Sequence, residues 1–359
     1  MTAIFGSLRL SDTDRVYNAT VGQRMIYDAI ADHLAMHNAA LNAAMAMFVE
    51  ETTENHTERF QLPGGGRLQR RGSQSDVAAV KQTGYWDVAF PLDDFGDAIA
   101  GDDVTLAYMT VRDLEKHVTT VLTRDTNTVR HELLRAMFRS TAATHVDPLW
   151  GSLTIQPLAN GDGTLYPPVI GSDTEADDTH LVNTGYATAN ISDTNDPIAG
   201  IAIPELEQHF GQITGNSPIA VFINAAQVAK VSALTAMIEV TDRWVRPGDD
   251  TATPTGLPPI PGKIIGRHGR GAWVSQWDYI PSGYMLAVHL DAPKPLKMRV
   301  DPSDTGLPQG LTLVARDMEF PFERSTWRHR FGFGVANRLN GVAIEVSDDG
   351  AYTTPTAYA

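Results

Sequence analysis

The chain has 359 residues, of which 42% are hydrophobic and 20% charged, and its formal net charge is −15. This composition predicts a globular protein of two or three domains, or one large domain with excursions, with a sizeable core. The acidic balance argues against a protein that coats nucleic acid, because such proteins carry a basic footprint. Cysteine is absent, which excludes disulfides, thiolate metal sites and cysteine nucleophiles.

The N-terminal residues lack the basic end and the long apolar run of a signal peptide. The longest apolar stretch, residues 218–238, is interrupted by Asn224, Gln227 and Lys230, so no membrane span is predicted. The sequence therefore predicts a soluble protein that is made in a cytoplasm and has no membrane partner.

The first predicted element is a long helix over residues 12–50, which Asp12 or Thr13 can cap. Its apolar residues recur mostly at three- or four-residue steps. They are Val21, Ile26, Ile30, Leu34, Leu41, Met45 and Phe48. His33 and His37 have a spacing that can hold zinc, but no third ligand is evident. The favoured interpretation is the polar surface of a packed helix.

Residues 51–100 have the pattern of a long β-hairpin, with extended runs on both sides of Gly64–Gly66. The predicted tip, Gln61–Gly72, joins these glycines to Arg67, Arg70 and Arg71. Few large apolar residues lie near the tip, so it cannot pack a core of its own. Three interpretations stay open: an arm that lies on another surface, a mobile surface loop, or an anion site built by arginines beside a glycine turn.

A second long helix is predicted over residues 110–138, with Thr110 as its N-cap and Asp113 in the first turn. The apolar spacing is helical except for a polar gap at Arg124–Thr128. At 1.5 Å per residue, such a helix is roughly 40 Å long.

From residue 150 onward the pattern is mixed α/β, with a buried strand at 218–224 followed by a helix at 225–234. Residues 171–197 and 246–262 are predicted to be surface excursions. Short strands are expected at Lys263–Ile265, Ala272–Val274, Met285–Leu290, Met298–Val300, Leu311–Ala315 and Val342–Val346.

No motif for catalysis, a cofactor or a metal is complete. Gly332-Phe-Gly334 lacks the third glycine of a dinucleotide fingerprint, and Gly64–Gly66 lacks the Lys-Ser/Thr pair of a Walker loop. The acidic cluster of residues 173–180 lacks the glycine and final glutamate of a calcium loop, so a solvated loop is favoured. Its members are Asp173, Glu175, Asp177, Asp178 and His180. We therefore predict no catalytic residue, no cofactor and no metal.

The order of these elements resembles the major capsid protein of tailed bacteriophages, which has the Hong Kong 97 fold. Residues 84–100 and 106–114 look like the return of that family's extended loop into its spine helix. Residues 218–227 and 283–293 resemble strands and a helix of its axial domain, and residues 327–343 resemble its closing strand pair.

The resemblance implies an α+β chain in five parts. They are an N-terminal arm and helix (1–50), an extended loop or E-loop (51–100), the spine helix with the first part of the peripheral domain (101–165), the axial domain (166–295), and the return to the peripheral domain with the C-terminus (296–359).

The implied function is self-assembly into hexamers and pentamers of an icosahedral shell that encloses the double-stranded DNA genome of a tailed phage. The subunit would reside in the virion and assemble in the cytoplasm of the host bacterium. Its partners would be other copies of itself, a portal, a separate scaffolding protein, an optional decoration protein, and DNA held on the inner face without sequence specificity. The E-loop tip would contact a neighbouring subunit through Gly64, Gly65, Gly66, Arg67, Arg70 and Arg71.

Two features depart from some members of the family. A cross-link between a loop lysine and an asparagine is disfavoured, because Lys81 lies well away from the glycine tip and Asn337 and Asn340 are candidates by position alone. Only about 100 residues precede the spine helix, so a cleaved N-terminal scaffold is not expected. The alternatives are the shell of an encapsulin-like cellular nanocompartment and, from another class, a soluble α/β enzyme.

Overall fold

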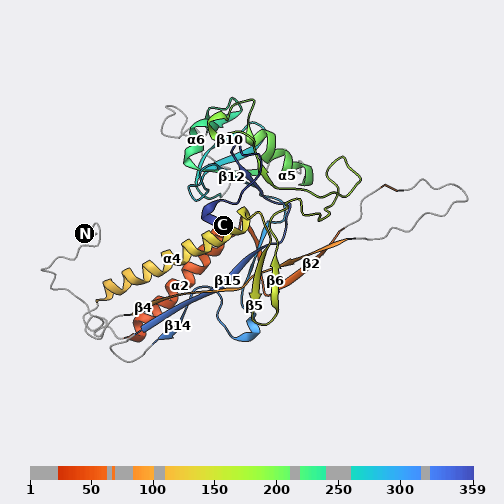
Figure 1. The fold of residues 1–359 in the computed structure, drawn as a ribbon. Helices are drawn as coiled ribbons and strands as arrows, with labels where there is room; N and C mark the ends of the chain where they lie inside the picture. Colours follow the sequence, from red (N-terminus) through yellow and green to blue (C-terminus); the bar gives the residue numbers. More distant parts are fainter. Residues whose placement is uncertain are drawn as a thin grey trace, which may run out of the picture. The chain divides into compact units, whose positions relative to one another are not determined.

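The computed structural model describes residues 23–62, 67–68, 84–100, 110–210, 219–239, 260–316 and 324–359 (Figure 1). These residues form two compact units. Unit 1 takes its described residues from the ranges Met1–Ala43, Asp93–Arg130 and Val300–Phe331, and unit 2 takes them from Ala44–Leu92, His131–Arg299 and Gly332–Ala359. Helices and sheets both occur, so the predicted α+β class is confirmed.

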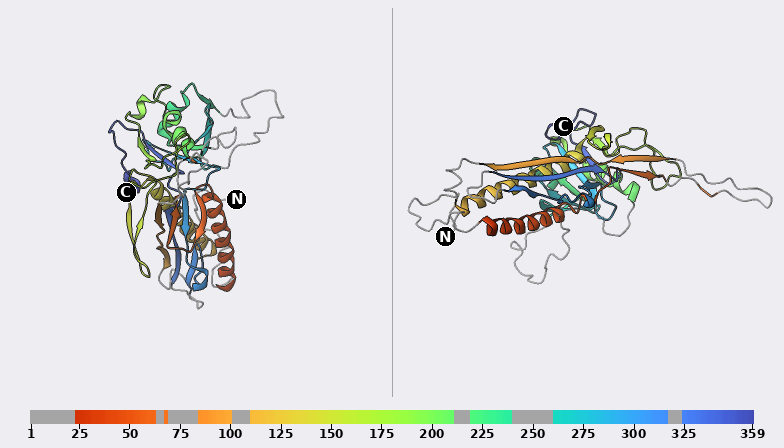
Figure 2. Two further views of the ribbon diagram at one scale, coloured as in Figure 1. Left: turned by 90° about the vertical axis from the view of Figure 1, so that its right-hand side faces the viewer. Right: turned by 90° about the horizontal axis from the view of Figure 1, so that it is seen from below.

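Unit 1 packs two helices against three antiparallel strands, which Figure 2 shows from two further sides. The elements are α2 (Gln23–Met45), the first part of α4 (Val111–Phe138), β4 (Asp93–Ala100), β14 (Thr312–Arg316) and the first part of β15 (Arg324–Val335). Strand β15 lies between β4 and β14 and pairs with both. Apolar side chains from both helices and from the strands form one core: Ile30, Leu34, Ile99, Leu114, Val118, Val121, Leu311 and Trp327.

Helix α4 begins where its cap was predicted. The backbone N–H of Asp113 donates to Oγ1 of Thr110 (3.3 Å), and the Thr110 hydroxyl donates to Oδ2 of Asp113 (2.7 Å). These bonds satisfy a free donor of the first turn and place a negative charge at the positive end of the helix dipole. The hydrogen bond from the Thr110 side chain also lowers the pKa of Asp113.

The polar gap in α4 has partners within unit 1. The guanidinium of Arg124 donates to Oδ2 of Asp97 on β4 (2.8 Å), and the buried Asp125 accepts hydrogen bonds from two histidines. The hydroxyls of Thr126 and Thr128 donate to backbone carbonyls one turn earlier. The helix therefore stays continuous where its apolar pattern is interrupted.

The prediction that the first helix continues to residue 50 is wrong. Helix α2 ends at Met45, and strand β1 (Val49–Thr53) follows after a short turn. The ring of Phe48 packs against Phe222 and Trp277, with centroid distances of 5.6 and 5.8 Å. The backbone then pairs in parallel with β13, because long-range packing and sheet pairing outweigh the local helical pattern. The predicted residues 12–22 lie outside the described part of the chain.

The main sheet of unit 2 has seven strands in the order β7-β16-β12-β8-β11-β10-β9. Their bounds are β7 (Leu181–Asn183), β8 (Ile219–Ile223), β9 (Met237–Glu239), β10 (Lys263–His268), β11 (Ala272–Gln276), β12 (Tyr284–His289) and β16 (Val342–Glu345). All five residues of β8 are buried, as expected for a continuous apolar run with a strand on each side. The predicted strands of this region are confirmed to within a few residues.

Two short helices pack on the seven-stranded sheet: α5 (Ile203–Phe210) and α6 (Ala225–Ser232). Their buried residues Ile203, Leu206 and Val231 belong to the same apolar core as the strands. Helix α6 was predicted, and a capping box between Asn224 and Gln227 fixes its start.

Unit 2 also contains three smaller strand groups. Strand β1 pairs with β13 (Leu296–Arg299), which pairs in turn with the end of β15. Two hairpins complete the unit: β2 (Thr57–Gln61) with β3 (Tyr85–Ala89), and β5 (Ala143–Asp147) with β6 (Gly151–Ile155). The pairing of β2 with β3 confirms the inner part of the predicted hairpin, whereas the outer strands β1 and β4 pair with β13 and β15 and not with each other. Among the described residues, no helix is long and apolar enough to cross a membrane.

The Gly332-Phe-Gly334 motif lies within β15, and the next element is strand β16 and not a helix, so the motif is no dinucleotide fingerprint. A Cβ atom built on Gly334 would be 2.5 Å from Cδ1 of Phe90 and 2.8 Å from the carbonyl oxygen of Ala89. A Cβ atom on Gly332 would be 2.3 Å from the carbonyl oxygen of Pro91. These glycines are therefore explained by the close approach of the segment Ala89–Pro91.

We expect Gly334→Ala to lower the free energy of unfolding by about 1–3 kcal/mol, the usual cost of an added methyl group that forces a packed site to shift. Gly200→Ala is the matched control, because no atom beyond its chain neighbours and the backbone of its own helix would lie within 4 Å of its new Cβ. Chemical unfolding of both variants measures the difference. Equal stabilities for the two variants would show that the contact between β15 and Phe90 is not tight.

Candidate functional sites

The β2–β3 hairpin has a well-paired base. Arg59 donates from Nε and Nη2 to the two carboxylate oxygens of Asp87 (2.6 and 2.7 Å), and its guanidinium lies 4.1 Å from the ring centroid of Tyr85. The rings of Phe60 and Trp86 stack with centroids 5.6 Å apart. Cross-strand pairs of this kind hold the two strands in register.

The predicted tip lies mostly outside the described residues, including Gly64, Gly65, Gly66, Arg70 and Arg71, and so does Lys81, the lysine considered for a cross-link. Arg67 is described, and its exposed guanidinium forms an ion pair with Asp173 of the acidic segment. This contact shows that a tip arginine can bind a carboxylate, here one of the same chain. The role of the tip in contacts between subunits stays a prediction.

The two asparagines considered for a cross-link have partners inside unit 2. The side-chain amide of the buried Asn340 donates to the carbonyl oxygens of His289 (3.0 Å) and Pro293 (2.8 Å), and its Oδ1 accepts from the His289 N–H (2.9 Å). Asn337 donates to the same Pro293 carbonyl at 2.9 Å. These bonds give Asn340 a structural role, which joins the end of β12 to the loop after β15.

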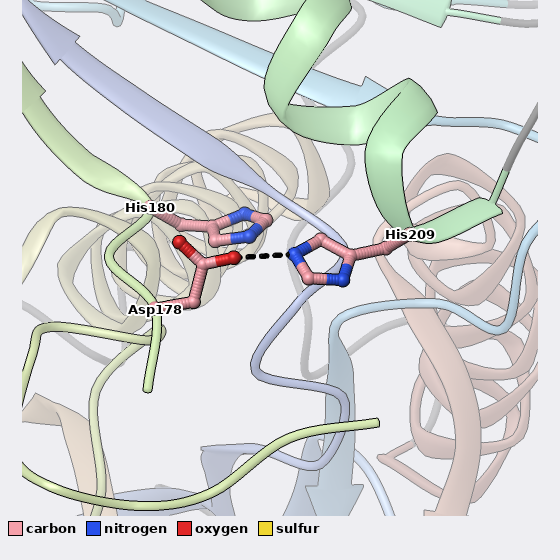
Figure 3. A group of neighbouring side chains, drawn as sticks. All are labelled: Asp178, His180 and His209. Atoms are coloured by element: carbon pink, nitrogen blue, oxygen red, sulfur yellow. Dashed lines mark hydrogen bonds and ion pairs between the residues drawn. The ribbon is translucent and has the colours of Figure 1, made fainter. Parts of the chain in front are cut away.

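A cluster of one carboxylate and two imidazoles lies beside the seven-stranded sheet (Figure 3). Asp178 and His180 directly precede β7, and His209 lies near the end of α5. Nε2 of His209 donates to Oδ2 of Asp178 at 2.7 Å, and the two histidine rings have centroids 5.2 Å apart. Each residue offers one atom that could bind a metal ion, and these three atoms all lie within 4.8 Å of one another.

The backbone of His180 is fixed on both sides. Its N–H donates to the carbonyl oxygen of Ala159 (2.7 Å), and its carbonyl oxygen accepts from the N–H of Ala343 on β16 (2.9 Å). The position of the imidazole is therefore set by the sheet and not by an independent loop.

The imidazole of His180 is fully buried, with 0% of the residue exposed. Nδ1 lies 3.0 Å from the carbonyl oxygen of Gly341, and because a carbonyl can only accept, Nδ1 carries the hydrogen. Among the residues that the structure describes, Nε2 has no hydrogen-bond partner. Burial, together with the nearby His209, lowers the pKa of His180 to about 4, so the ring is neutral near pH 7.

Asp178 is ionised beside these rings. Burial alone would raise its pKa, but hydrogen bonds from His209 and from the Thr179 N–H outweigh that effect and lower it. The Gln208 amide donates to the same carboxylate at 3.2 Å and to Glu205 at 2.7 Å. A carboxylate with this many donors remains charged at neutral pH.

The prediction that residues 173–180 form a solvated loop is therefore wrong for the last residue, His180, which is buried. The surface excursion predicted for 171–197 is also wrong in part, because Leu181–Asn183 forms β7 and pairs in parallel with β16. The short apolar pair Leu181-Val182 was hidden among polar residues, and only the pairing with β16 makes it a strand. Arg67 and Asp173, by contrast, are exposed as expected.

Unit 1 contains a second polar cluster, centred on Asp125 of α4. Its Oδ2 lies 2.9 Å from Nε2 of His37, and its Oδ1 lies 2.6 Å from Nδ1 of His329. His33, the other half of the possible zinc pair, is exposed instead. Asp125 and His329 line a cavity of about 400 Å³. The cluster ties α2, α4 and β15 together.

No protein family and no curated protein matches this sequence. A chain in a solved structure of Mycobacterium phage Patience matches it with a TM-score of 0.67 at 16% identity, over 98% of each chain. The chain has a phage-capsid fold. Two further capsid structures are more distant from this capsid-fold chain. For the capsid of Myoviridae phage XM1, the TM-score is 0.47 at 10% identity, over 85% of this chain and 92% of that chain. For the mature capsid of bacteriophage PhiM1, the TM-score is 0.48 at 8% identity, over 83% of this chain and 85% of that chain.

The resemblance that the element order predicted is thus confirmed at the level of the fold. At 16% identity, the roles of individual residues in the capsid-fold chain must rest on its own contacts. In the cluster of Asp178, His180 and His209, which we call the buried cluster, His209 was missed by the sequence analysis. The available signal was the spacing of Ile203, Leu206 and Phe210, which indicates a short amphipathic helix carrying that histidine.

Proposed function

We propose that this chain is the major capsid protein of a tailed bacteriophage, which assembles into hexamers and pentamers of an icosahedral shell around double-stranded DNA. The observation that carries the proposal is the fold shared with the Mycobacterium phage Patience chain along 98% of both chains. A likeness over the full length indicates the same arrangement of elements and not one common subdomain. The role is structural and not catalytic.

In this proposal, helix α4 is the spine helix and the β2–β3 hairpin is the base of the E-loop. The seven-stranded sheet with α5 and α6 is the axial domain, and β1, β13 and β15 belong to the peripheral domain. The proposed parts are 1–50, 51–100, 101–165, 166–295 and 296–359, except that β1 (Val49–Thr53) joins the peripheral domain and β16 (Val342–Glu345) joins the axial sheet. Two exposed apolar side chains near the loop, Tyr85 and Leu68, support its placement on a second subunit, because such surface is suited to a partner.

The acidic balance of the chain fits a shell that surrounds DNA without gripping it. A net charge of −15 disfavours tight binding to phosphates, so DNA on the inner face would be held by confinement and not by sequence. The mature subunit would reside in the virion after assembly in the host cytoplasm. A portal, a separate scaffolding protein and an optional decoration protein would be its other partners.

Negative-stain electron microscopy of the purified chain, alone and co-expressed with a scaffolding protein encoded by the same genome, tests the proposal. Closed shells, capsomer rings or tubes are the expected result. A homogeneous monomer at high concentration under both conditions would contradict it. Shells isolated from cells with an enzyme inside, and without DNA, would instead indicate a nanocompartment.

A further inference from the structure

The side chain of His180 has a buried nitrogen that the protein itself does not satisfy. Nε2 is inaccessible to solvent and finds no hydrogen-bond partner in the described part of the chain, while Nδ1 donates to the Gly341 carbonyl. Buried polar atoms are nearly always paired, because an unpaired one loses its interaction with water without replacement. This nitrogen therefore points to a missing partner.

The missing partner must be an electron-pair acceptor. Because Nδ1 holds the hydrogen, Nε2 of the neutral ring presents a lone pair. A histidine that binds a metal through one nitrogen typically donates its other N–H to a carbonyl or carboxylate, which fixes its tautomer and orientation. His180 has this arrangement already in place.

The other two members of the cluster supply the remaining ligands. Figure 3 shows the His180 ring beside the Asp178 carboxylate, with His209 facing both from α5. We propose that Asp178, His180 and His209 bind one divalent transition-metal ion, of which Zn²⁺ is the best fit. Two imidazole nitrogens and one carboxylate oxygen form a common protein ligand set for zinc, with water as the fourth ligand.

The distances are compatible with such a site. If the three ligand atoms lay at the full separation of 4.8 Å, an ion at their centre would be about 2.8 Å from each. Zinc–nitrogen bonds are about 2.0–2.1 Å long, so small side-chain rotations suffice. Binding through Nε2 of His209 replaces its hydrogen bond to Asp178. The hydrogen on Nε2 moves to Nδ1 by exchange with water, which frees the Nε2 lone pair for the ion.

The ligand chemistry also selects among metals. Imidazole favours zinc, cobalt, nickel and copper, whereas magnesium and calcium prefer oxygen donors. The chain has no cysteine, so a structural metal site must use nitrogen and oxygen ligands. The ion would join the segment before β7 to the end of α5. It would stabilise the folded chain, because the unfolded chain does not hold the three ligands together.

The test is a titration of the tag-free full chain, after dialysis against a chelator, with Co²⁺ as a visible probe. We expect one Co²⁺ per chain, the absorption bands of tetrahedral cobalt, and displacement of these bands by Zn²⁺. Loss of an outer hydrogen-bond partner already weakens metal binding about 10- to 100-fold, so Asp178→Asn, His209→Gln and His180→Gln should each weaken it at least about 100-fold.

Two matched controls separate this site from general surface binding. Asp177→Asn changes the neighbouring carboxylate, and His33→Gln removes an exposed histidine, so both should bind Co²⁺ as the natural chain does. Absence of the cobalt bands in the natural chain would overturn the proposal. Unchanged affinity in both Asp178→Asn and His209→Gln would also overturn it, even if His180→Gln fails to fold. Neither outcome bears on the proposed capsid role, which electron microscopy tests separately.

Discussion

Replacement of Arg338 by methionine is expected to lower the free energy of unfolding by about 3 kcal/mol, the lower end of the range for breaking a buried ion pair. Arg338 is 2% exposed, and its guanidinium donates to the Pro157 carbonyl (2.9 Å), the Asn160 side chain (3.0 Å) and the Asp162 carboxylate (2.8 Å). Methionine fills similar space but leaves these acceptors unpaired. The lower end applies because the Asp162 side chain is 28% exposed and can still reach water.

Arg59→Met is the matched control for this prediction. Arg59 also pairs with an aspartate, but the side chains of Arg59 and Asp87 are 57% and 42% exposed. Exposed pairs of this kind contribute about 0–1 kcal/mol, because water and salt screen them. Urea unfolding of the unassembled chain compares the two variants. If both variants lost the same free energy of unfolding, burial would not be the reason for the stabilising effect of Arg338.

The parts of the fold that sequence predicted well are those determined by local signals. Helix α4 combines helical spacing with a cap at Thr110, and β8 is a short apolar run next to a capping box at Asn224. The cap at Thr110 marks the start of α4, and the capping box at Asn224 marks the end of β8 and the start of α6. The end of α2 was misplaced because the apolar pattern continues to Phe48, while the packing of Phe48 on Phe222 starts a new element.

The buried cluster could be predicted only in part, for a related reason. Asp178 and His180 belong to an acidic segment, but nothing nearby in the sequence indicates that the sheet buries His180. His209 comes from α5, and the fold alone brings it within hydrogen-bond distance of Asp178. The same limit explains Asn340, which position alone makes a candidate for the disfavoured cross-link and whose contacts show a structural role.

The largest effect on assembly is expected from removing the arginines of the predicted loop tip, in the triple variant Arg67→Ala, Arg70→Ala, Arg71→Ala. Arg67 already binds an acidic side chain of its own chain, Asp173. In a shell, the proposed E-loop would exchange this partner for carboxylates of a neighbouring subunit. Exposed charge pairs contribute about 0.2–1 kcal/mol each, so three lost pairs weaken each contact about tenfold.

Because each subunit makes this contact with a neighbour, the loss is multiplied around the shell. The protein concentration at which shells form should therefore rise at least about tenfold, which light scattering and electron microscopy can measure. Arg59→Ala is the control, since it removes an arginine from the same hairpin whose partner, Asp87, lies in that hairpin. Assembly of the triple variant at the natural concentration would contradict the assignment of the tip. If Arg59→Ala raised the assembly concentration as much as the triple variant, the cause would lie in the hairpin base, where Arg59 and Asp87 hold β2 and β3 in register.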